Sequence, residues 1–198
     1  MSPEIKYLVG IDEAGRGPLA GSVSVGAVRI PVQFDWEPWR GVRDSKKLTP
    51  LARDEWFKKI HRAHRDGILR FAVAFASSNY IDRRGIVPAI HFALGRALDR
   101  LNADPLETLV LLDGSLWAPE PFCFQKTIIH GDDREPVISM ASIAAKVLRD
   151  RKMIALARRY PAYGFESHKG YATREHFKRI ATYGICSLHR KSFLTRLI

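Results

Sequence analysis

The sequence VGIDEAGRGPLAG, residues 9–21, places two acids, Asp12 and Glu13, at the end of an apolar segment. Residues 5–11 (IKYLVGI) favour a β-strand, and residues 19–30 (LAGSVSVGAVRI) favour a second strand through their partial alternation. The intervening DEAGRGP is rich in turn-forming residues. The stretch therefore predicts two strands joined by a turn, with both acids where the first strand ends.

The rest of the chain alternates helical and extended patterns, without an internal repeat or a low-complexity linker. Thr49 and Pro50 favour the start of a helix, as N-cap and first-turn residues. The run TLVLL ends on Asp113-Gly114, as a buried strand that ends at a turn would. We predict helices over residues 50–65, 87–101, 138–159 and 173–182, strands over 68–76, 108–112 and 122–129, and a loop over 31–45.

This order of elements predicts an α/β fold. Three early strands followed by alternating helices and strands are typical of a mixed central sheet flanked by helices. The length of 198 residues fits one domain with a sizeable core. We expect a single domain over residues 1–198, in which residues from about 160 to 198 form a C-terminal helical extension.

The charge balance favours a polyanionic partner. Thirty-two Lys and Arg residues against twenty-one Asp and Glu residues give a formal net charge of +11 and a sequence pI near 10.0. Such a basic domain favours nucleic acid, and a solvated basic surface is the alternative. The basic residues are spread along the chain, so a binding face must be assembled by folding.

Apolar runs and cysteines indicate the cellular setting. No apolar run approaches the ~18–20 residues that span a bilayer, and the first residues lack the apolar stretch of a signal peptide. Cys123 and Cys186 are too few and too distant for a disulfide framework, and no Cys/His spacing indicates a zinc site. We interpret both as structural thiols and expect a cytoplasmic monomer that does not bind membranes.

Four acids stand out by their positions at predicted element ends: Asp12, Glu13, Asp113 and Asp132. Carboxylates that converge repel one another, and a divalent cation relieves that repulsion. Oxygen ligands of this kind suit Mg²⁺ or Mn²⁺. The alternative is that each acid has only a local role, because Asp-Gly is a common turn pair and Asp132 or Asp133 could cap the following helix.

The residues 9–21 closely resemble the signature of prokaryotic ribonuclease HII. Further segments that resemble this family follow in the right order and extend the resemblance to residue 193. A single Gly-Arg-Gly would be a weak signal, whereas several ordered segments are a specific one. These segments are DSKKL (44–48), LLDG (111–114), GDDREPVISMASIAAKVLRDR (131–151), HKGYATREH (168–176) and LHRKSF (188–193).

The resemblance implies a ribonuclease H-like fold and cleavage of the RNA strand in RNA–DNA hybrids. It also implies incision of duplex DNA on the 5′ side of an embedded ribonucleotide, as in ribonucleotide excision repair. The family's four carboxylates, which hold two Mg²⁺ or Mn²⁺ ions, correspond to Asp12, Glu13, Asp113 and Asp132. Asp133 is the alternative to Asp132 if the alignment shifts by one residue.

The resemblance also implies roles in substrate binding. The turn Gly15-Arg16-Gly17 would bind the 2′-hydroxyl at the junction with DNA, because glycines allow close backbone approach and this hydroxyl distinguishes RNA. Tyr171 would pack against the deoxyribose that follows, with a core or surface aromatic as the alternative. Lys46 and Lys47 are candidate phosphate contacts, and a solvated loop pair is their alternative.

Some residues depart from the family pattern or have a simpler interpretation. Residues 85–94 (GIVPAIHFAL) and Met140 differ from the usual sequence, which affects packing and substrate detail more than chemistry. Ser142, Lys146 and Asp150 share one helical face, and we interpret Lys146 and Asp150 as a salt bridge. His91 is expected to be packed or exposed and not to be a metal ligand.

Other functions are less well supported by the sequence. Gly15-x-Gly17 does not open a helix, as a dinucleotide-binding loop must, and no phosphate-binding P-loop motif occurs. The remaining alternatives are a hybrid-binding protein without catalytic activity and another nuclease of the same superfamily that acts on branched DNA. The presence of all four carboxylates argues against the first, and the Gly-Arg-Gly turn and Tyr171 argue against the second.

Overall fold

The computed structural model describes residues 4–194, and the elements alternate along the chain as in an α/β protein. The strands are β1 (Tyr7–Ala14), β2 (Val23–Pro31), β3 (Arg70–Ala76), β4 (Thr108–Asp113) and β5 (Gln125–Ile128). The helices are α1 (Pro50–Arg65), α2 (Ser78–Arg84), α3 (Ile86–Leu101), α4 (Gly131–Arg134), α5 (Pro136–Ala157), α6 (Phe165–His168), α7 (Arg174–Tyr183) and α8 (Lys191–Leu194). Short 3₁₀ turns lie at Glu37–Trp39, Ser45–Lys47 and Pro161–Tyr163.

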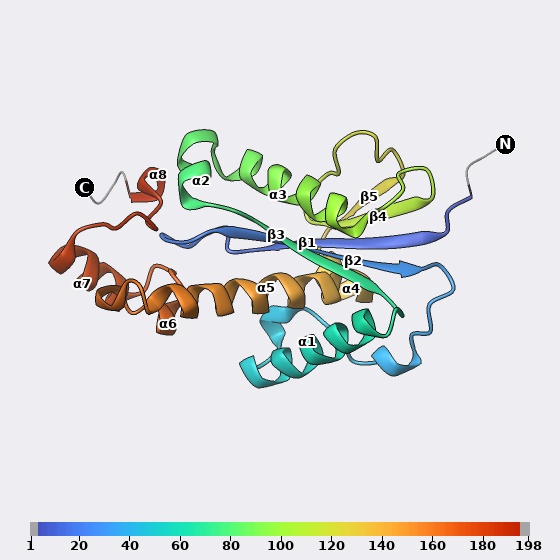
Figure 1. Ribbon diagram of the computed structural model, residues 1–198, viewed down its shortest axis with the longest axis horizontal. Coiled ribbons are helices and arrows are strands. Elements are labelled where there is room, and N and C mark those ends of the chain that lie inside the picture. The colour runs from blue at the N-terminus through green and yellow to red at the C-terminus, as the bar shows by residue number, and fades with distance from the viewer. Residues whose placement is uncertain (1–3, 195–198) are drawn as a thin grey trace.

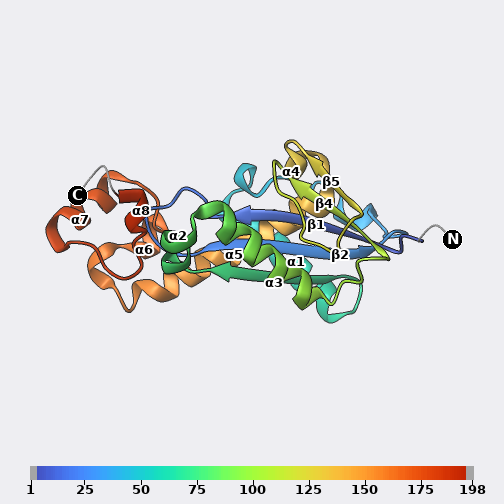
Figure 2. The same cartoon turned by 90° about the horizontal axis from the view of Figure 1, so that it is seen from above.

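The five strands form one mixed sheet in the order β3-β2-β1-β4-β5, which confirms the predicted mixed sheet. The first three strands are antiparallel neighbours, whereas β4 runs parallel to β1 and β5 runs parallel to β4. Helices cover both faces, with α3 on one side and α5 and α1 on the other (Figures 1 and 2). The central strand β1 therefore lies between two layers of helix.

Each face of the sheet has its own apolar core. Alternation along β1 sends Val9 and Ile11 into the cluster beneath α3, while Leu8 packs with the cluster formed by α1 and α5. Ile11 is completely buried. The two cores hold the sheet rigidly between the helices, so the strand ends that carry acids have fixed positions.

Two glycines allow α5 to lie directly on the sheet. A Cβ atom at Gly10 in β1 would overlap the backbone of Val137, and one at Gly26 in β2 would overlap the carbonyl of Ala141. Ser24, also in β2, is fully buried, and its hydroxyl lies within hydrogen-bond distance of the carbonyls of Ala14 and Ala145. The buried hydroxyl of Ser24 is thus accounted for by its contacts with the end of β1 and with α5.

Several predicted boundaries were wrong by a few residues. β2 begins at Val23 and not at residue 19, because Leu19 and Ala20 bond instead to the carbonyl of Gly170. β5 begins at Gln125 and not at residue 122, since Phe122 and Cys123 form turn contacts near two prolines. The helix expected from residue 138 begins at Pro136, which suits the first turn of a helix.

The segment after α5 is helical, with α6, α7 and α8 at the end of the molecule far from the N-terminus (Figure 1). It returns to the β1–β2 connection through an isolated bridge between Ala20 and His189. Within residues 4–194, no helix combines the length and apolar character needed to cross a membrane. The final residues 195–198, part of the predicted extension, lie outside the described residues.

Candidate active site

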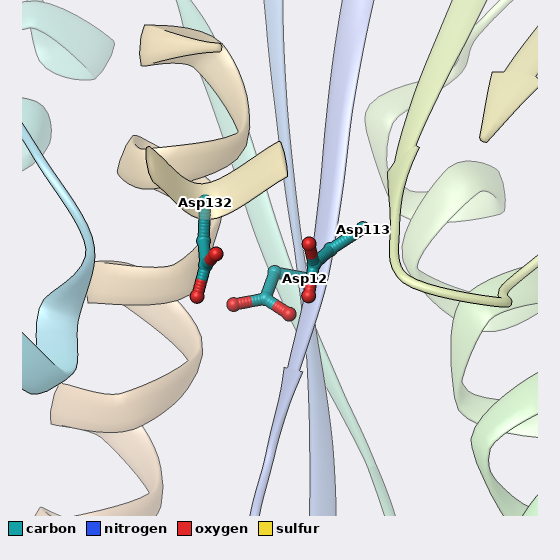
Figure 3. A group of neighbouring side chains, drawn as sticks. All are labelled: Asp12, Asp113 and Asp132. Atoms are coloured by element: carbon teal, nitrogen blue, oxygen red, sulfur yellow. The ribbon is translucent and has the colours of Figure 1, made fainter. Parts of the chain in front are cut away.

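Three aspartates from separate segments lie together near the ends of β1 and β4 (Figure 3). Asp12 lies two residues before the end of β1, Asp113 is the last residue of β4, and Asp132 lies in the short helix α4. One carboxylate oxygen of each lies within 4.8 Å of the others. The structure thus brings together three of the four acids named from the sequence, and Glu13 is not a member of this group.

The strand register explains how Asp12 and Asp113 meet. The parallel pairing of β1 with β4 sets Ile11 beside Leu112, so the next residues along the two strands are neighbours. Residues at the same level of adjacent strands point to the same face of a sheet. Asp12 and Asp113 therefore project together on the side of the sheet that α5 covers, which is also the side of Gly10.

Asp132 reaches the site because α4 is fixed to the end of β4. The backbone N–H of Gly131 donates to Asp113 Oδ1 at 2.7 Å, and a Cβ atom at Gly131 would lie 2.7 Å from Ile138. Ser139 in α5 donates from its hydroxyl to the carbonyl of Asp132 at 2.7 Å. The close seat of α5 on the sheet then places Asp132 opposite Asp12.

The surroundings of Asp12 strongly disfavour the charged form of its carboxyl group. It is 2% exposed, and burial, followed by the negative charge of Glu13, raises its pKa well above the ordinary value. Ser142 opposes this shift, and Asp113 adds to it. Asp12 Oδ1 accepts from the N–H of Glu13 at 2.7 Å, whereas its buried Oδ2 has no hydrogen-bond partner in the described chain.

Glu13 is held apart from the aspartates by its neighbour Arg16. Successive strand residues point to opposite faces, so Glu13 projects away from Asp12. Arg16 donates from its guanidinium to Glu13 Oε1 at 3.2 Å. Burial raises the pKa of Glu13, the charge of Arg16 lowers it, and Asp113 raises it, with a net shift upwards. Glu13 therefore interacts electrostatically with Asp113 but does not belong to the aspartate group.

Lys46 and Lys47 bind the two acids of the Gly-Asp-Asp segment. Lys46 Nζ donates to Asp132 Oδ2 at 3.0 Å, and Lys47 Nζ donates to Asp133 Oδ2 at 2.7 Å. Burial alone would lower the pKa of Lys46, but the hydrogen bond and charge of Asp132 outweigh it and raise that pKa. Asp132 is buried and faces the aspartate group, whereas the exposed Asp133 does not belong to it.

Asp44 was not named from the sequence as a site residue. Its side chain accepts from the N–H of Lys46 at 2.8 Å and so fixes the turn that carries the lysines. It also forms a second close group with Asp132 and Asp133. Burial raises the pKa of Asp44, the backbone bond to Lys46 lowers it, and the charge of Asp132 raises it. Its pattern, Asp before Ser-Lys-Lys, is also that of an ordinary cap, so only the fold reveals its position.

The donor set fits a divalent metal of the Mg²⁺ type. Its atoms are all carboxylate oxygens, which such hard cations prefer, and no histidine or cysteine belongs to either group. The unpartnered buried Oδ2 of Asp12 is the kind of atom that a cation would satisfy. A cation would also relieve the repulsion that raises the pKa of Asp12.

The candidates for recognition of the RNA–DNA junction lie in two loops that contact each other. Gly15 is buried with φ +89°, while Arg16 and Gly17 are exposed. The loop of Tyr171 meets this turn because Leu19 N–H donates to the Gly170 carbonyl at 2.8 Å. Tyr171 is 38% exposed, and Lys146 Nζ lies 5.2 Å above its ring.

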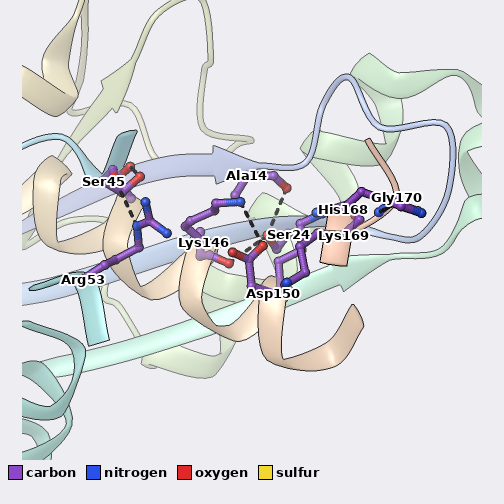
Figure 4. Close-up of polar contacts among 12 residues, drawn as sticks. Ala14, Ser24, Ser45, Arg53, Lys146, Asp150, His168, Lys169 and Gly170 are labelled. Carbon is purple, nitrogen blue, oxygen red and sulfur yellow. Dashed lines mark hydrogen bonds and ion pairs between the residues drawn. The ribbon is translucent and has the colours of Figure 1, made fainter. Parts of the chain in front are cut away.

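Polar contacts lie along the long helix α5 and around the Ser45–Lys47 turn, which also contacts α1 (Figure 4). Lys146 Nζ donates to Asp150 Oδ1 at 2.9 Å, which confirms the predicted salt bridge. Arg53 in α1 donates to the carbonyl of Ser45 at 2.9 Å, and the hydroxyls of Ser45 and Ser142 lie 2.8 Å apart. Both cysteines are free, with Cys123 exposed and Cys186 partly buried. The ring of His91 packs on Trp117.

Comparison with known proteins identifies the group to which these features belong. A sequence profile described as Ribonuclease HII matches residues 9–196. Ribonuclease HII of Caldicellulosiruptor saccharolyticus is 42% identical over 193 residues, which are 98% of this chain and 89% of that protein. Among solved structures, ribonuclease HII of Archaeoglobus fulgidus, solved in complex with PCNA, has a TM-score of 0.73 and 26% identity, with 93% of each chain covered.

A more distant structure has the same fold. Bst-RNase HIII, solved in complex with Mn²⁺, has a TM-score of 0.66 at 16% identity, covering 96% of this chain and 65% of that one. At this level of identity the likeness concerns the arrangement of the elements alone.

Proposed function

The chain belongs to the ribonuclease HII family, and we propose that it incises duplex DNA on the 5′ side of an embedded ribonucleotide. As a member of this family it is a metal-dependent endoribonuclease that acts on RNA–DNA hybrids. The observation that carries the proposal is the convergence of Asp12, Asp113 and Asp132, with Asp12 three residues ahead of the Gly15–Gly17 turn. A candidate metal centre and a candidate ribose-binding turn thus adjoin each other at the end of β1.

We assign the metal site to Asp12, Glu13, Asp113 and Asp132, with two Mg²⁺ or Mn²⁺ ions. Asp12 and Asp113 would contact both ions, while Glu13 and Asp132 would each contact one. Such ions supply an activated water and neutralise charge on the leaving 3′-oxygen. Glu13 projects from the other face of β1 and bonds to Arg16, so its side chain would have to leave Arg16 and bend towards the end of the strand to reach an ion. The expected products are a 3′-hydroxyl and a 5′-phosphate.

We propose that Lys46 and Lys47 bind phosphates of the substrate. Each already bonds to an acid, so the lysines are held above the carboxylates with their positive charges close to the site. A flexible ammonium binds phosphate oxygen without reading base sequence. Both side chains are largely exposed, at 70% and 56%, which leaves them free to exchange a carboxylate partner for a phosphate.

Recognition of the RNA–DNA junction is assigned to the Gly15–Gly17 turn and Tyr171. The turn would bind the ribose 2′-hydroxyl through main-chain groups, and the Tyr171 ring would pack on the deoxyribose that follows. A flat ring accepts a sugar without a 2′-hydroxyl and crowds one that carries it. Hydrogen bonds between the two loops support this arrangement because they set the spacing between the two recognition elements.

The proposal is tested with matched labelled duplexes that differ in one feature. One carries a single ribonucleotide, one is a long RNA–DNA hybrid, one is entirely DNA, and one is branched DNA without ribonucleotides. In Mg²⁺ or Mn²⁺ we expect a cut 5′ of the single ribonucleotide and cuts in the hybrid, with ends that a ligase and a phosphatase identify.

The controls separate the alternatives. The all-DNA and branched duplexes should remain intact, and a chelator should abolish all cutting. Cutting of branched DNA alone would favour the other nuclease of this superfamily. Tight hybrid binding without cleavage in either metal would favour the non-catalytic binding protein and reject the proposed incision.

A further inference from the structure

Two arginines, Arg149 in α5 and Arg190 before α8, are completely buried without an acidic partner. Both are 0% exposed, and within residues 4–194 neither forms a salt bridge. Buried charges are normally paired, because taking an ion out of water is costly. Burial lowers the pKa of both groups, and the charge of Arg149 further lowers that of Arg190, to about 9. These positions therefore need another explanation than apolar packing.

The partners of Arg190 are main-chain carbonyls of the Gly15–Gly17 turn and of Gly21, which follows it. Its Nη2 donates to the carbonyl of Gly15 at 2.6 Å, and its Nη1 donates to that of Arg16 at 2.8 Å. Its Nε donates to the carbonyl of Gly21 at 3.0 Å. One planar guanidinium thus holds three carbonyls of a single loop, a task that suits the rigid fork of arginine.

Arg149 connects that loop to the one that carries Tyr171. Its Nε donates to the carbonyl of Ser22 at 3.0 Å, and its Nη2 lies 3.2 Å from the carbonyl of Lys169. The same Nη2 lies 3.4 Å from the carbonyl of Ala20, while Nη1 is buried without a partner. The guanidinium carbon lies 5.4 Å from the centre of the Tyr171 ring. Arg149 is therefore placed between the two proposed recognition elements.

The turn shows a clear division between its donors and its acceptors. The carbonyls of Gly15 and Arg16 are bound from the interior by Arg190. Across the part of the chain that the structure describes, the N–H groups of Gly15, Arg16 and Gly17 donate to no protein acceptor. Main-chain donors that a protein leaves free around a turn are suited to an oxygen of a ligand.

We propose that Arg190 and Arg149 are positioning residues for recognition of the RNA–DNA junction. Arg190 holds the carbonyls of the Gly15–Gly17 turn inwards, which leaves its N–H groups available to the ribose. Arg149 sets the spacing between this turn and Tyr171. The inference rests on the proposed function of those two elements and assigns the side chains that hold them. Neither arginine contacts the substrate.

The test uses Arg190→Lys, because lysine keeps the charge but loses the planar fork that binds three carbonyls. Binding to two duplexes, one entirely DNA and one with a single ribonucleotide, is measured in Ca²⁺ under conditions in which gels show no cleavage. We expect the wild type to prefer the ribonucleotide duplex. The variant should lose about three- to tenfold of that preference, the effect of one or a few hydrogen bonds, while its affinity for the DNA duplex changes less than about twofold.

A matched control is Arg158→Lys, the same substitution at an exposed position next to the end of α5. It should retain the full preference. A wild type without preference would reject the proposed ribose recognition itself. A folded Arg190→Lys protein with wild-type preference would reject the positioning role while leaving the proposed function intact.

Stability is checked by the midpoint of thermal unfolding for every variant. If Arg190→Lys does not fold, Arg190→Gln is measured, since an amide still offers donors to the carbonyls of Gly15 and Arg16. If neither folds, Arg149→Lys decides by the same criterion, with reduced preference for the ribonucleotide duplex as the expected result. Unchanged preference in the folded variant used would overturn the proposal.

Discussion

At the residue scale, Gly15 and Gly17 differ in what the protein itself requires of them. Gly15 has φ +89°, a backbone conformation that favours glycine, and a Cβ atom there would overlap the Arg149 side chain. Gly17 has an ordinary backbone conformation, and a Cβ atom there would meet no atom within 4 Å. The fold explains Gly15, whereas the protein alone places no demand on Gly17, which suits the proposed contact of the turn with a ribose.

This difference predicts opposite effects of two alanine substitutions. Gly15→Ala should destabilise the protein by on the order of 1–3 kcal/mol because of strain and overlap. Gly17→Ala should leave the unfolding midpoint within about 2 °C of the wild type, an effect of a few tenths of a kcal/mol, and still reduce cleavage at a single ribonucleotide. Thermal unfolding and steady-state cleavage of the two variants check this. Full activity of Gly17→Ala would show that the turn does not contact the sugar closely.

At the element scale, a cluster of histidines supports the segment that carries Tyr171. His189 Nδ1 accepts from the N–H of Cys186 at 2.9 Å, so its Nε2 carries the proton that is shared with His176 Nε2 at 3.1 Å. His176 then donates from Nδ1 to the carbonyl of Tyr171 at 2.9 Å. His168 stacks on His176, with ring centres 4.3 Å apart. An added proton on His176 would place two N–H groups against each other.

The histidine cluster predicts a loss of stability in mild acid. Burial first, and then the neighbouring histidines, lower the pKa of His176 to about 4, against an unfolded value near 6.5. The unfolded chain therefore binds more protons between these values, so stability falls as pH falls from about 6.5 towards 4. We expect His176 to contribute a loss on the order of 1–2 kcal/mol between pH 7 and pH 5.

Urea unfolding at both pH values measures this loss for the wild type and for His176→Gln. The difference between the two pH values should be smaller in the variant. The exposed His61 supplies a control, because His61→Gln should keep the wild-type difference. Equal pH dependence in all three proteins would contradict the proposed neutral state of His176.

Elements with a strong local signal were predictable from the sequence. Thr49 caps α1 by accepting from the N–H of Ala52, as its position before Pro50 indicated. The short helices α2 and α4 were missed, because four to seven residues carry too little periodicity to be distinguished from turns. The early start predicted for β2 failed for another reason, since Leu19 and Ala20 bond to a loop 150 residues further on.

At the scale of the whole molecule, the site exists because segments distant in sequence pack together near the ends of β1 and β4. The resemblance named Asp12, Asp113 and Asp132 in advance, because each stands in a motif with its own local pattern. Arg149 and Arg190 also lie in segments that resemble the family, but nothing in those segments indicates which groups their side chains bind. Most of their partners are carbonyls 127 to 175 positions away, and the Lys169 carbonyl that Arg149 also binds is 20 positions away. No periodicity or spacing in the sequence connects these groups.

The positions of the basic residues behind the net charge of +11 likewise depend on the whole fold. The sequence indicates a polyanionic partner, but only the fold shows where positive groups meet acids, as Lys46 meets Asp132 and Lys47 meets Asp133. Lys46 and Lys47 offset the repulsion among the carboxylates. In the proposed function they would also offer positive charge to an approaching phosphate.

The measurement that tests the central claim most directly is cleavage of a labelled DNA duplex with one ribonucleotide, in Mg²⁺ or Mn²⁺, by the wild type, Asp132→Asn and Asp133→Asn. We expect a metal-dependent cut 5′ of the ribonucleotide. Asp132→Asn should lower kcat/KM by about 100-fold or more, or roughly 2.7 kcal/mol of transition-state stabilisation, and Asp133→Asn by less than about fivefold. No cut by the wild type, or loss of cleavage in Asp133→Asn with Asp132→Asn unaffected, would contradict the account.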